Sequence, residues 1–260
     1  MELFDTHFHW DKKMEPTVIV SEAKSSNVNY GVCIGADYSS SLLSKQFVEN
    51  FENYWFAAGV HPHESSKFNE GLSQFKELFA NPKLVAVGEI GLDYFYDFSD
   101  KKSQLKTMEI FTECALKINK PLIVHIRDKD NKFDAFEESF QILKDFAKDN
   151  GKFVVHCFTG SNKWLDTFLE LGAFIGITGM VTFPKAENIR KLINCIPDER
   201  LLIETDSPYL APKPFRGKTN YPKYLIETTK KISEIKSIDL DVLADITTNN
   251  AKKFYNLILE

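Results

Sequence analysis

Short apolar runs recur along the whole chain, and each one ends in polar or charged residues. Most of these runs are continuous rather than alternating, which is typical of parallel strands that are covered on both faces. Their spacing leaves room for a helix between each run and the next. The runs predict eight strands: Leu3–Thr6, Tyr30–Ile34, Trp55–Val60, Leu84–Ile90, Leu122–His125, Phe153–Phe158, Ala173–Ile177 and Leu201–Thr205.

Apolar residues at three- and four-residue spacing indicate amphipathic helices between the strands. The clearest example contains Leu105, Met108, Phe111, Ala115 and Ile118. Further helices are expected at Thr17–Ser25, Leu42–Phe51, Leu72–Phe79, Ala135–Phe146, Lys163–Leu171, Ala186–Ile193 and Tyr224–Ile235, with a closing helix at Leu240–Leu257.

The alternation of eight strands with helices predicts a (β/α)8 TIM barrel with an extra C-terminal helix. An open doubly wound sheet is the alternative, but such sheets usually have fewer strands and often a glycine-rich phosphate loop. Neither GxGxxG nor GxxxxGK[ST] occurs in the chain, which favours the barrel. No linker, internal repeat or low-complexity stretch divides the chain, so a single domain over residues 1–260 is expected.

The composition indicates what class of protein this is and in which cellular compartment we expect it. A hydrophobic content of 43% and a charged content of 27% are those of a globular protein in water. No apolar run approaches the roughly 20 residues that span a bilayer, and the residues before the first predicted strand lead us to expect no signal peptide. The four cysteines form no CxxC pair, which predicts reduced thiols in a cytoplasmic protein. The formal net charge of -5 argues against a broad basic surface, so any phosphate contact should be local.

All six histidines lie within three residues of the end of a predicted strand, and none falls in a predicted helix. The carboxyl ends of barrel strands form the rim that carries the active site, so we expect these side chains to converge there. His7 and His9 point to the same side of an extended chain and can bind one ion, although an isolated pair could also be two polar turn residues. His61 and His63 have the same spacing but could orient substrate instead.

Two carboxylates complete the candidate site. Glu89 ends an otherwise apolar strand, where a buried charge is costly unless it is paired with a cation. A metal would supply that charge, and the alternative is a buried salt bridge, although no lysine or arginine lies in residues 84–91. Asp206 follows the last strand and is a candidate ligand or general base. Glu204 is expected to have a structural role.

These residues predict two divalent ions that share Glu89. One set of ligands is His7, His9, Glu89 and Asp206, and the other is Glu89, His125 and His156. Mixed nitrogen and oxygen ligands suit zinc or manganese better than magnesium. Cys157 should point away from His156 into the core.

The remaining rim residues favour a phosphodiester over a neutral amide as substrate. Arg127 can share the side of His125 and offer its bidentate fork to a phosphate oxygen. Arg216 lies in a basic loop after the last strand, and Tyr94 could stack or donate a hydrogen bond. Each of these residues taken alone is an ordinary loop residue.

The chain resembles the TatD-type metal-dependent deoxyribonucleases of the amidohydrolase superfamily. Six motifs carry the resemblance: Phe4–His9, Gly59–His63, Val87–Tyr94, Pro121–Arg127, Val155–Gly160 and Ile203–Leu210. The resemblance implies a (β/α)8 barrel and 3′-to-5′ exonuclease action on single-stranded DNA. Magnesium often supports activity in that family, so zinc, manganese and magnesium all stay candidates.

Position by position, the resemblance implies a set of metal ligands: His7, His9, Glu89, His125, His156 and Asp206. It also implies a set of residues lining the phosphate and nucleotide pocket: His63, Tyr94, Arg127 and Arg216. Many amidohydrolases bridge their metals with a carbamylated lysine, but no lysine lies between Leu84 and Tyr94, and Glu89 takes that place.

The sequence therefore predicts a DNA phosphodiesterase in which Asp206 accepts a proton from a metal-bound water. Two rival functions stay open. A metal-dependent esterase or amidase, such as a deacylase of mischarged aminoacyl-tRNA, could use the same ligands. A non-catalytic binding protein could retain the barrel without the reaction. No stable protein partner is inferred.

Overall fold

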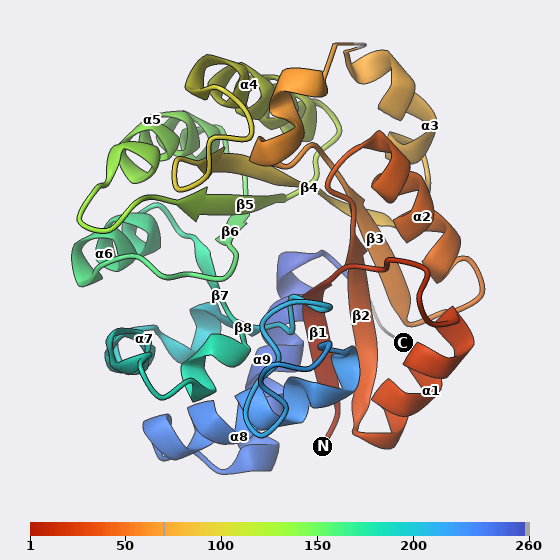
Figure 1. Cartoon of the computed structure of the whole chain (residues 1–260), viewed down its shortest axis with the longest axis vertical. Coiled ribbons are helices and arrows are strands. Elements are labelled where there is room, and N and C mark those ends of the chain that lie inside the picture. Colours follow the sequence, from red (N-terminus) through yellow and green to blue (C-terminus); the bar gives the residue numbers. More distant parts are fainter. Residues whose placement is uncertain (70, 258–260) are drawn as a thin grey trace.

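Eight parallel strands form one sheet in sequential order in the computed structural model, which describes residues 1–69 and 71–257 (Figure 1). The strands are β1 Leu3–Phe8, β2 Val28–Ile34, β3 Tyr54–Ala58, β4 Leu84–Asp93, β5 Leu122–Arg127, β6 Phe153–Val155, β7 Phe174–Ile177 and β8 Leu201–Ile203. The first strand and the chain after the last one are joined where the Asp206 amide donates to the His7 carbonyl at 2.9 Å. The sheet thus curls into a barrel.

Helices surround the sheet (Figure 1). They are α1 Pro16–Ser25, α2 Tyr38–Val48, α3 Lys76–Phe79, α4 Lys101–Lys117, α5 Asp134–Lys148, α6 Asn162–Glu170, α7 Glu187–Ile193, α8 Leu225–Lys236 and α9 Leu240–Phe254. Short 3-10 segments are η1 Pro62–Lys67, η2 Leu72–Phe75, η3 Gly179–Thr182, η4 Asp198–Arg200 and η5 Pro222–Tyr224. The predicted (β/α)8 barrel with an extra C-terminal helix is confirmed. None of the helices in the described part of the chain is long and apolar enough to cross a membrane.

Local sequence explains the longer helices. In α4, the Asp100 side chain caps the first turn by accepting from the Ser103 amide at 2.9 Å. Met108, Phe111 and Ala115 of its apolar stripe are fully buried against the barrel. The capped start and the buried stripe together stabilise the helix in this position.

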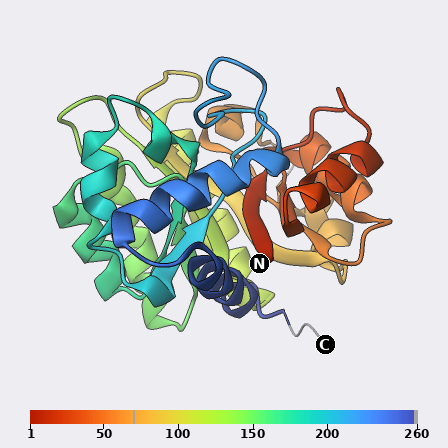
Figure 2. The same ribbon diagram turned by 90° about the horizontal axis from the view of Figure 1, so that it is seen from below.

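Two apolar layers form the core. One lies between the sheet and the surrounding helices. The other lies inside the barrel and combines residues of all eight strands with Ala251 and Phe254 of α9 and with Tyr255, which follows the helix. Figure 2 shows α9 below the barrel, beside the N-terminus and opposite the long rim loops. The extra helix therefore closes the bottom of the barrel and leaves the opposite rim open for a site.

Two strands carry register shifts that set the direction of site residues. Phe4 belongs to the interior core and Phe8 to the outer layer, although regular alternation would place both on one face. The shift of β1 between Asp5 and Phe8 accounts for the reversal and leaves His7 facing inward. In β4, a second register shift lies between Val87 and Ile90, in the segment that contains Glu89.

Several predicted boundaries were wrong. The strand β6 ends at Val155, so His156 follows the strand, and Cys157 then takes a left-handed conformation at φ 46° that ends the extended chain. The strand β8 ends at Ile203 rather than at the predicted Thr205, and Asp206 follows it at φ 54°. The expected helix over residues 72–79 is a 3-10 turn followed by the four-residue α3.

Two further expectations concern His63 and the domain boundary. His63, which lies outside every predicted helix, is in the 3-10 segment η1. The single domain over residues 1–260 stays a prediction, and Glu70 and residues 258–260 lie outside the described part.

Candidate metal centre

Histidines and carboxylates from six strand ends converge at the open rim. Three overlapping groups have ligand atoms within 4.8 Å of one another: His7, His9 and Glu89; His7, His156 and Asp206; and His61, Glu89 and His125. The six predicted metal ligands therefore lie in one cluster, together with His61. Their role as ligands stays a prediction.

Glu89 lies at the centre of the cluster, and its two oxygens face different histidines. The Oε2 atom is 3.4 Å from His7 Nε2 and 3.7 Å from His9 Nε2. The Oε1 atom is 2.9 Å from His125 Nδ1 and 3.0 Å from His156 Nε2. A carboxylate placed between two sets of imidazoles has the arrangement that a bridging ligand needs.

The buried carboxylates and imidazoles of the cluster shift one another's pKa. Burial alone would lower the pKa of His9, His125 and His156, but the neighbouring carboxylates raise it. Burial alone would raise the pKa of Glu89, but the charge on His156 and the neighbouring imidazoles hold its pKa well below the ordinary value. Burial lowers the pKa of His61 and His7, which favours neutral imidazoles with free lone pairs. The Nε2 atoms of His7 and His9 lie only 3.2 Å apart. These converging nitrogen and oxygen donors fit a divalent ion such as zinc or manganese.

Three imidazole rings each form a hydrogen bond through the nitrogen that faces away from Glu89. His9 Nδ1 lies 2.9 Å from the Ile34 carbonyl, which leaves Nε2 for the centre. His125 Nε2 is 3.0 Å from Asp93 Oδ2, which leaves Nδ1 for the centre. Such outer partners orient imidazole ligands and select their tautomer.

Glu204 holds the third ring. Its Oε1 lies 3.1 Å from His156 Nδ1 and also accepts from the Cys157 amide at 2.6 Å. The structural role that the sequence predicted for Glu204 is therefore that of a partner to His156. The Cys157 thiol lies 3.5 Å from the Thr178 hydroxyl, and burial raises the pKa of this thiol to about 12.

Asp206 lies at the edge of the cluster. Its Oδ1 is 3.5 Å from His9 Nε2 and 3.8 Å from His7 Nε2. The side chain is 14% exposed, against 3% for Glu89, so Asp206 is the carboxylate that a substrate can reach. The left-handed backbone that turns it toward the histidines is tolerated by aspartate because its short side chain can bond locally.

The four predicted substrate-binding residues take different positions. His63 borders the cluster, with Nε2 at 3.0 Å from Asp93 Oδ2. The Arg127 guanidinium lies over the Phe95 ring, 4.1 Å from its centroid. The Arg216 guanidinium lies 4.5 Å from the centroid of a phenylalanine ring in the β7–α7 loop. These three residues belong to rim segments around the centre.

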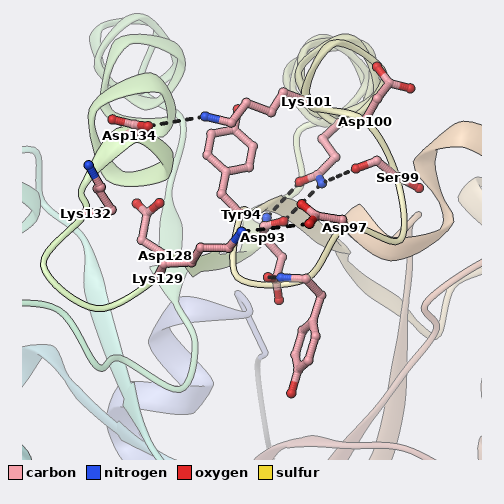
Figure 3. Close-up of a pocket in the computed structure, with 12 residues that line it drawn as sticks. Asp93, Tyr94, Asp97, Ser99, Asp100, Lys101, Asp128, Lys129, Lys132 and Asp134 are labelled. Carbon is pink, nitrogen blue, oxygen red and sulfur yellow. Dashed lines mark hydrogen bonds and ion pairs between the residues drawn. The ribbon is translucent and has the colours of Figure 1, made fainter.

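Tyr94 faces away from the metal centre. Its hydroxyl donates to Glu138 of α5 at 2.5 Å, and the Lys101 ammonium lies 4.0 Å from the centroid of its ring. Figure 3 shows Tyr94 among the residues lining a cavity of about 450 Å³ between the β4–α4 and β5–α5 loops. Its predicted contact with substrate would therefore be made in this cavity, beside Asp93.

Sequence reasoning gave too little weight to two residues of this site. His61 was considered mainly as a substrate residue, yet its Nε2 lies 3.6 Å from Glu89 Oε1. Its spacing from His63 was a usable signal. Asp93 appeared only as part of a motif, yet it lies between His63 and His125 and accepts from the amides of the following loop. Its position four residues after Glu89 on one long strand was the available signal.

Comparisons with known proteins agree with this architecture. The family model described as "TatD related DNase" matches residues 4–256. "Uncharacterized metal-dependent hydrolase YabD" of Bacillus subtilis is 35% identical over 259 residues, covering 98% of this chain and 99% of the relative. "3'-5' ssDNA/RNA exonuclease TatD" of Edwardsiella piscicida is 32% identical over 246 residues, covering 92% of each chain.

A solved structure matches over nearly the full length. The crystal structure of the TatD homologue YJJV from Escherichia coli K12 has a TM-score of 0.90 and 26% sequence identity, and the match covers 98% of both chains. The family model spans the barrel and every residue of the candidate metal centre. The chain therefore belongs to the family of TatD-related DNases.

Proposed function

We propose that this chain is a divalent-metal-dependent hydrolase of DNA phosphodiester bonds, acting as a 3′-to-5′ exonuclease on single strands. The observation that carries the proposal is the position of Glu89, whose two oxygens face separate pairs of histidines. The family description and the name of the Edwardsiella relative support a nucleic-acid substrate. We also propose a cytoplasmic location, since all four cysteines are free thiols.

The centre would hold two divalent ions, with zinc, manganese and magnesium as candidates. His7, His9 and Asp206 would bind one, His125 and His156 would bind the other, and Glu89 would bind both. Bound ions of this kind polarise a phosphate and lower the pKa of water. His61 is close enough to Glu89 to assist His125 and His156 in binding the second ion.

The protein's own residues would position the substrate and accept its proton. Asp206 is more exposed than Glu89 and would accept the proton of the attacking water. Arg127 and Arg216 would bind phosphate oxygens, and His63 would border the cleaved nucleotide. Tyr94 would contact the substrate from the adjoining cavity.

The test compares single-stranded DNA labelled at the 5′ end with the same strand labelled at the 3′ end, under zinc, manganese or magnesium. A 3′-to-5′ exonuclease produces a ladder of shortened products from the 5′-labelled strand and released mononucleotide from the 3′-labelled one. Hydrolysis of ester substrates without DNA cleavage would instead identify an esterase or deacylase. No bound metal and no cleavage with any of these ions would identify a binding protein.

A further inference from the structure

The exposed aromatic side chains of the described residues all lie on rim loops. Phe95 is 37% exposed, Tyr96 39% and Phe98 66%, and these three belong to the β4–α4 loop. Phe133 and Tyr209 lie in the loops after β5 and β8. Large apolar rings gathered on one exposed loop usually mark a binding surface. We call Phe95, Tyr96 and Phe98 the aromatic platform.

The rings of the platform are already arranged for stacking. Tyr96 and Phe98 are stacked, with ring centroids 5.3 Å apart and planes at 26°. The loop beneath them is fixed because Asp93 Oδ1 accepts from the amides of Phe95 at 3.0 Å and Tyr96 at 3.1 Å. A ligand would therefore meet ring faces held in position, at a small cost in side-chain entropy.

The platform adjoins the metal centre through two residues. The Phe98 ring lies 4.8 Å from the His63 ring, and the Tyr96 ring lies 5.5 Å from it. His63 shares Asp93 Oδ2 with His125, each at 3.0 Å. A group stacked on Phe98 would thus lie next to the nucleotide whose phosphate reaches the centre.

A cation accompanies the rings. The Arg127 guanidinium lies 4.1 Å from the Phe95 centroid and 5.0 Å from the Tyr96 centroid. Among the described residues, no carboxylate forms an ion pair with Arg127, so its charge is available to a ligand. Aromatic faces beside an unpaired cation match a base joined to a phosphate, which is the chemistry of single-strand binding sites.

We propose that the aromatic platform stacks one or two unpaired bases of the strand next to the cleaved nucleotide. The proposal rests on the proposed function, because it assigns the platform to the same nucleic-acid substrate. Inside a duplex both faces of a base are covered by its neighbours. The platform therefore selects strands whose bases are unstacked, whereas the metal centre acts on the phosphodiester alone.

The kinetic test distinguishes binding by the aromatic rings from hydrolysis at the metal centre. Phe98→Ala and Tyr96→Ala are each expected to raise KM for a single-stranded oligonucleotide about tenfold, because one stacked base contributes that much to binding. KM for a strand with abasic residues at its 3′ end, and turnover of bis(p-nitrophenyl) phosphate, should not change. Phe98→Trp should retain wild-type KM, and Leu42→Ala, which truncates a 41% exposed side chain on α2, is the matched control.

Three results would overturn the platform. They are an unchanged KM in both alanine variants, an equal loss on all three substrates, and a Phe98→Leu variant that behaves like wild type. The first removes any role in binding, the second indicates a structural role, and the third indicates apolar contact without stacking.

A binding measurement distinguishes failure of the platform from failure of the proposed function. Fluorescence anisotropy follows a labelled single strand with phosphorothioate linkages, which slow hydrolysis, as it binds the full-length protein. Tight binding that weakens about tenfold in Phe98→Ala supports the platform even if no natural DNA is cleaved, and then only the proposed nuclease activity fails. Absence of binding by the wild-type protein would overturn the platform, whatever diester the centre hydrolyses.

Discussion

At the scale of single residues, the proposed metal centre depends on carboxylates outside the proposed ligand set. Asp93 and Glu204 hold the far nitrogens of His125 and His156, and both are buried. The position of Glu204 also requires a glycine at residue 176, since a Cβ atom on Gly176 would lie 2.6 Å from the Glu204 carboxylate. These contacts turn the ring nitrogens toward Glu89 and orient the imidazoles before any ion binds.

Replacing Asp206 by asparagine tests the proposed proton acceptor. Asp206→Asn keeps the shape of the side chain but removes its basicity, so kcat should fall about 100- to 10,000-fold. The circular dichroism spectrum should match that of wild type, because the side chain lies at the exposed edge of the cluster. Full activity in this variant would end the assignment of Asp206 as the base.

Replacing Glu204 by glutamine tests the orienting role. Glu204→Gln removes the charge beside His156, and metal affinity should fall about tenfold to a hundredfold, measured by competition with a chelator. Glu22→Gln, which removes a carboxylate paired with Lys223 on the outside of the barrel, serves as the control. Equal affinities in the two variants would show that Glu204 only fills space.

At the scale of elements, irregular strand segments position the site. The register shifts in β1 and β4 lie next to His7 and Glu89, and left-handed residues end the extended chain after β6 and β8. Elsewhere, side chains complete the ends of regular elements. Lys83, just before β4, donates to the carbonyls of Val48, Phe51 and Tyr54 at the connection from α2 to β3.

Removing that ammonium should weaken the connection. Lys83→Met leaves three partly buried carbonyls without this donor, and the free energy of unfolding should fall by about 1–3 kcal/mol. Urea denaturation monitored by circular dichroism measures the change. Lys106→Met, at an exposed position on α4, should change the stability by less than about 0.5 kcal/mol. Similar values for both variants would show that water replaces the lysine at no cost.

At the scale of the whole molecule, the two ends of the barrel have different tasks. The bottom is sealed by α9 (Figure 2). The hydroxyl of Tyr255, the residue after this helix, donates to the Thr6 carbonyl at 2.7 Å, next to His7 in the chain. The rim carries the metal centre, the exposed aromatic rings and the basic loops. A sealed, apolar end supports the strands that hold the ligands at the other end.

Truncating the seal should destabilise the entire barrel. Phe254 is fully buried in the interior core, and Phe254→Ala should lower the free energy of unfolding by about 3–5 kcal/mol. Val242→Ala on the same helix truncates a 50% exposed side chain and should have an effect below about 0.5 kcal/mol. Equal denaturation midpoints would mean that α9 is not part of the cooperative unit.

Much of the fold could be predicted because its signals are local. Continuous apolar runs are typical of strands covered on both faces, and the stripe of α4 appears directly in the residue spacing. The strand ends that failed are those of β6 and β8, which stop at Val155 and Ile203. Cys157 and Phe158 continue the apolar run of β6, but the extended backbone ends there because the Cys157 amide donates to Glu204. After β8, the Asp206 amide donates to the His7 carbonyl of β1.

The sequence by itself determined the order of strands and helices and the gathering of six histidines at strand ends, because periodicity and rim position follow from neighbours along the chain. Only the tertiary structure decided which nitrogen of each ring faces Glu89, that His61 joins the cluster, and that Tyr94 turns outward. These features depend on register shifts and on partners 32 to 48 residues away, as for His125 with Asp93 and His156 with Glu204. Such contacts form only when the barrel closes, and no local pattern encodes the direction in which a side chain then points.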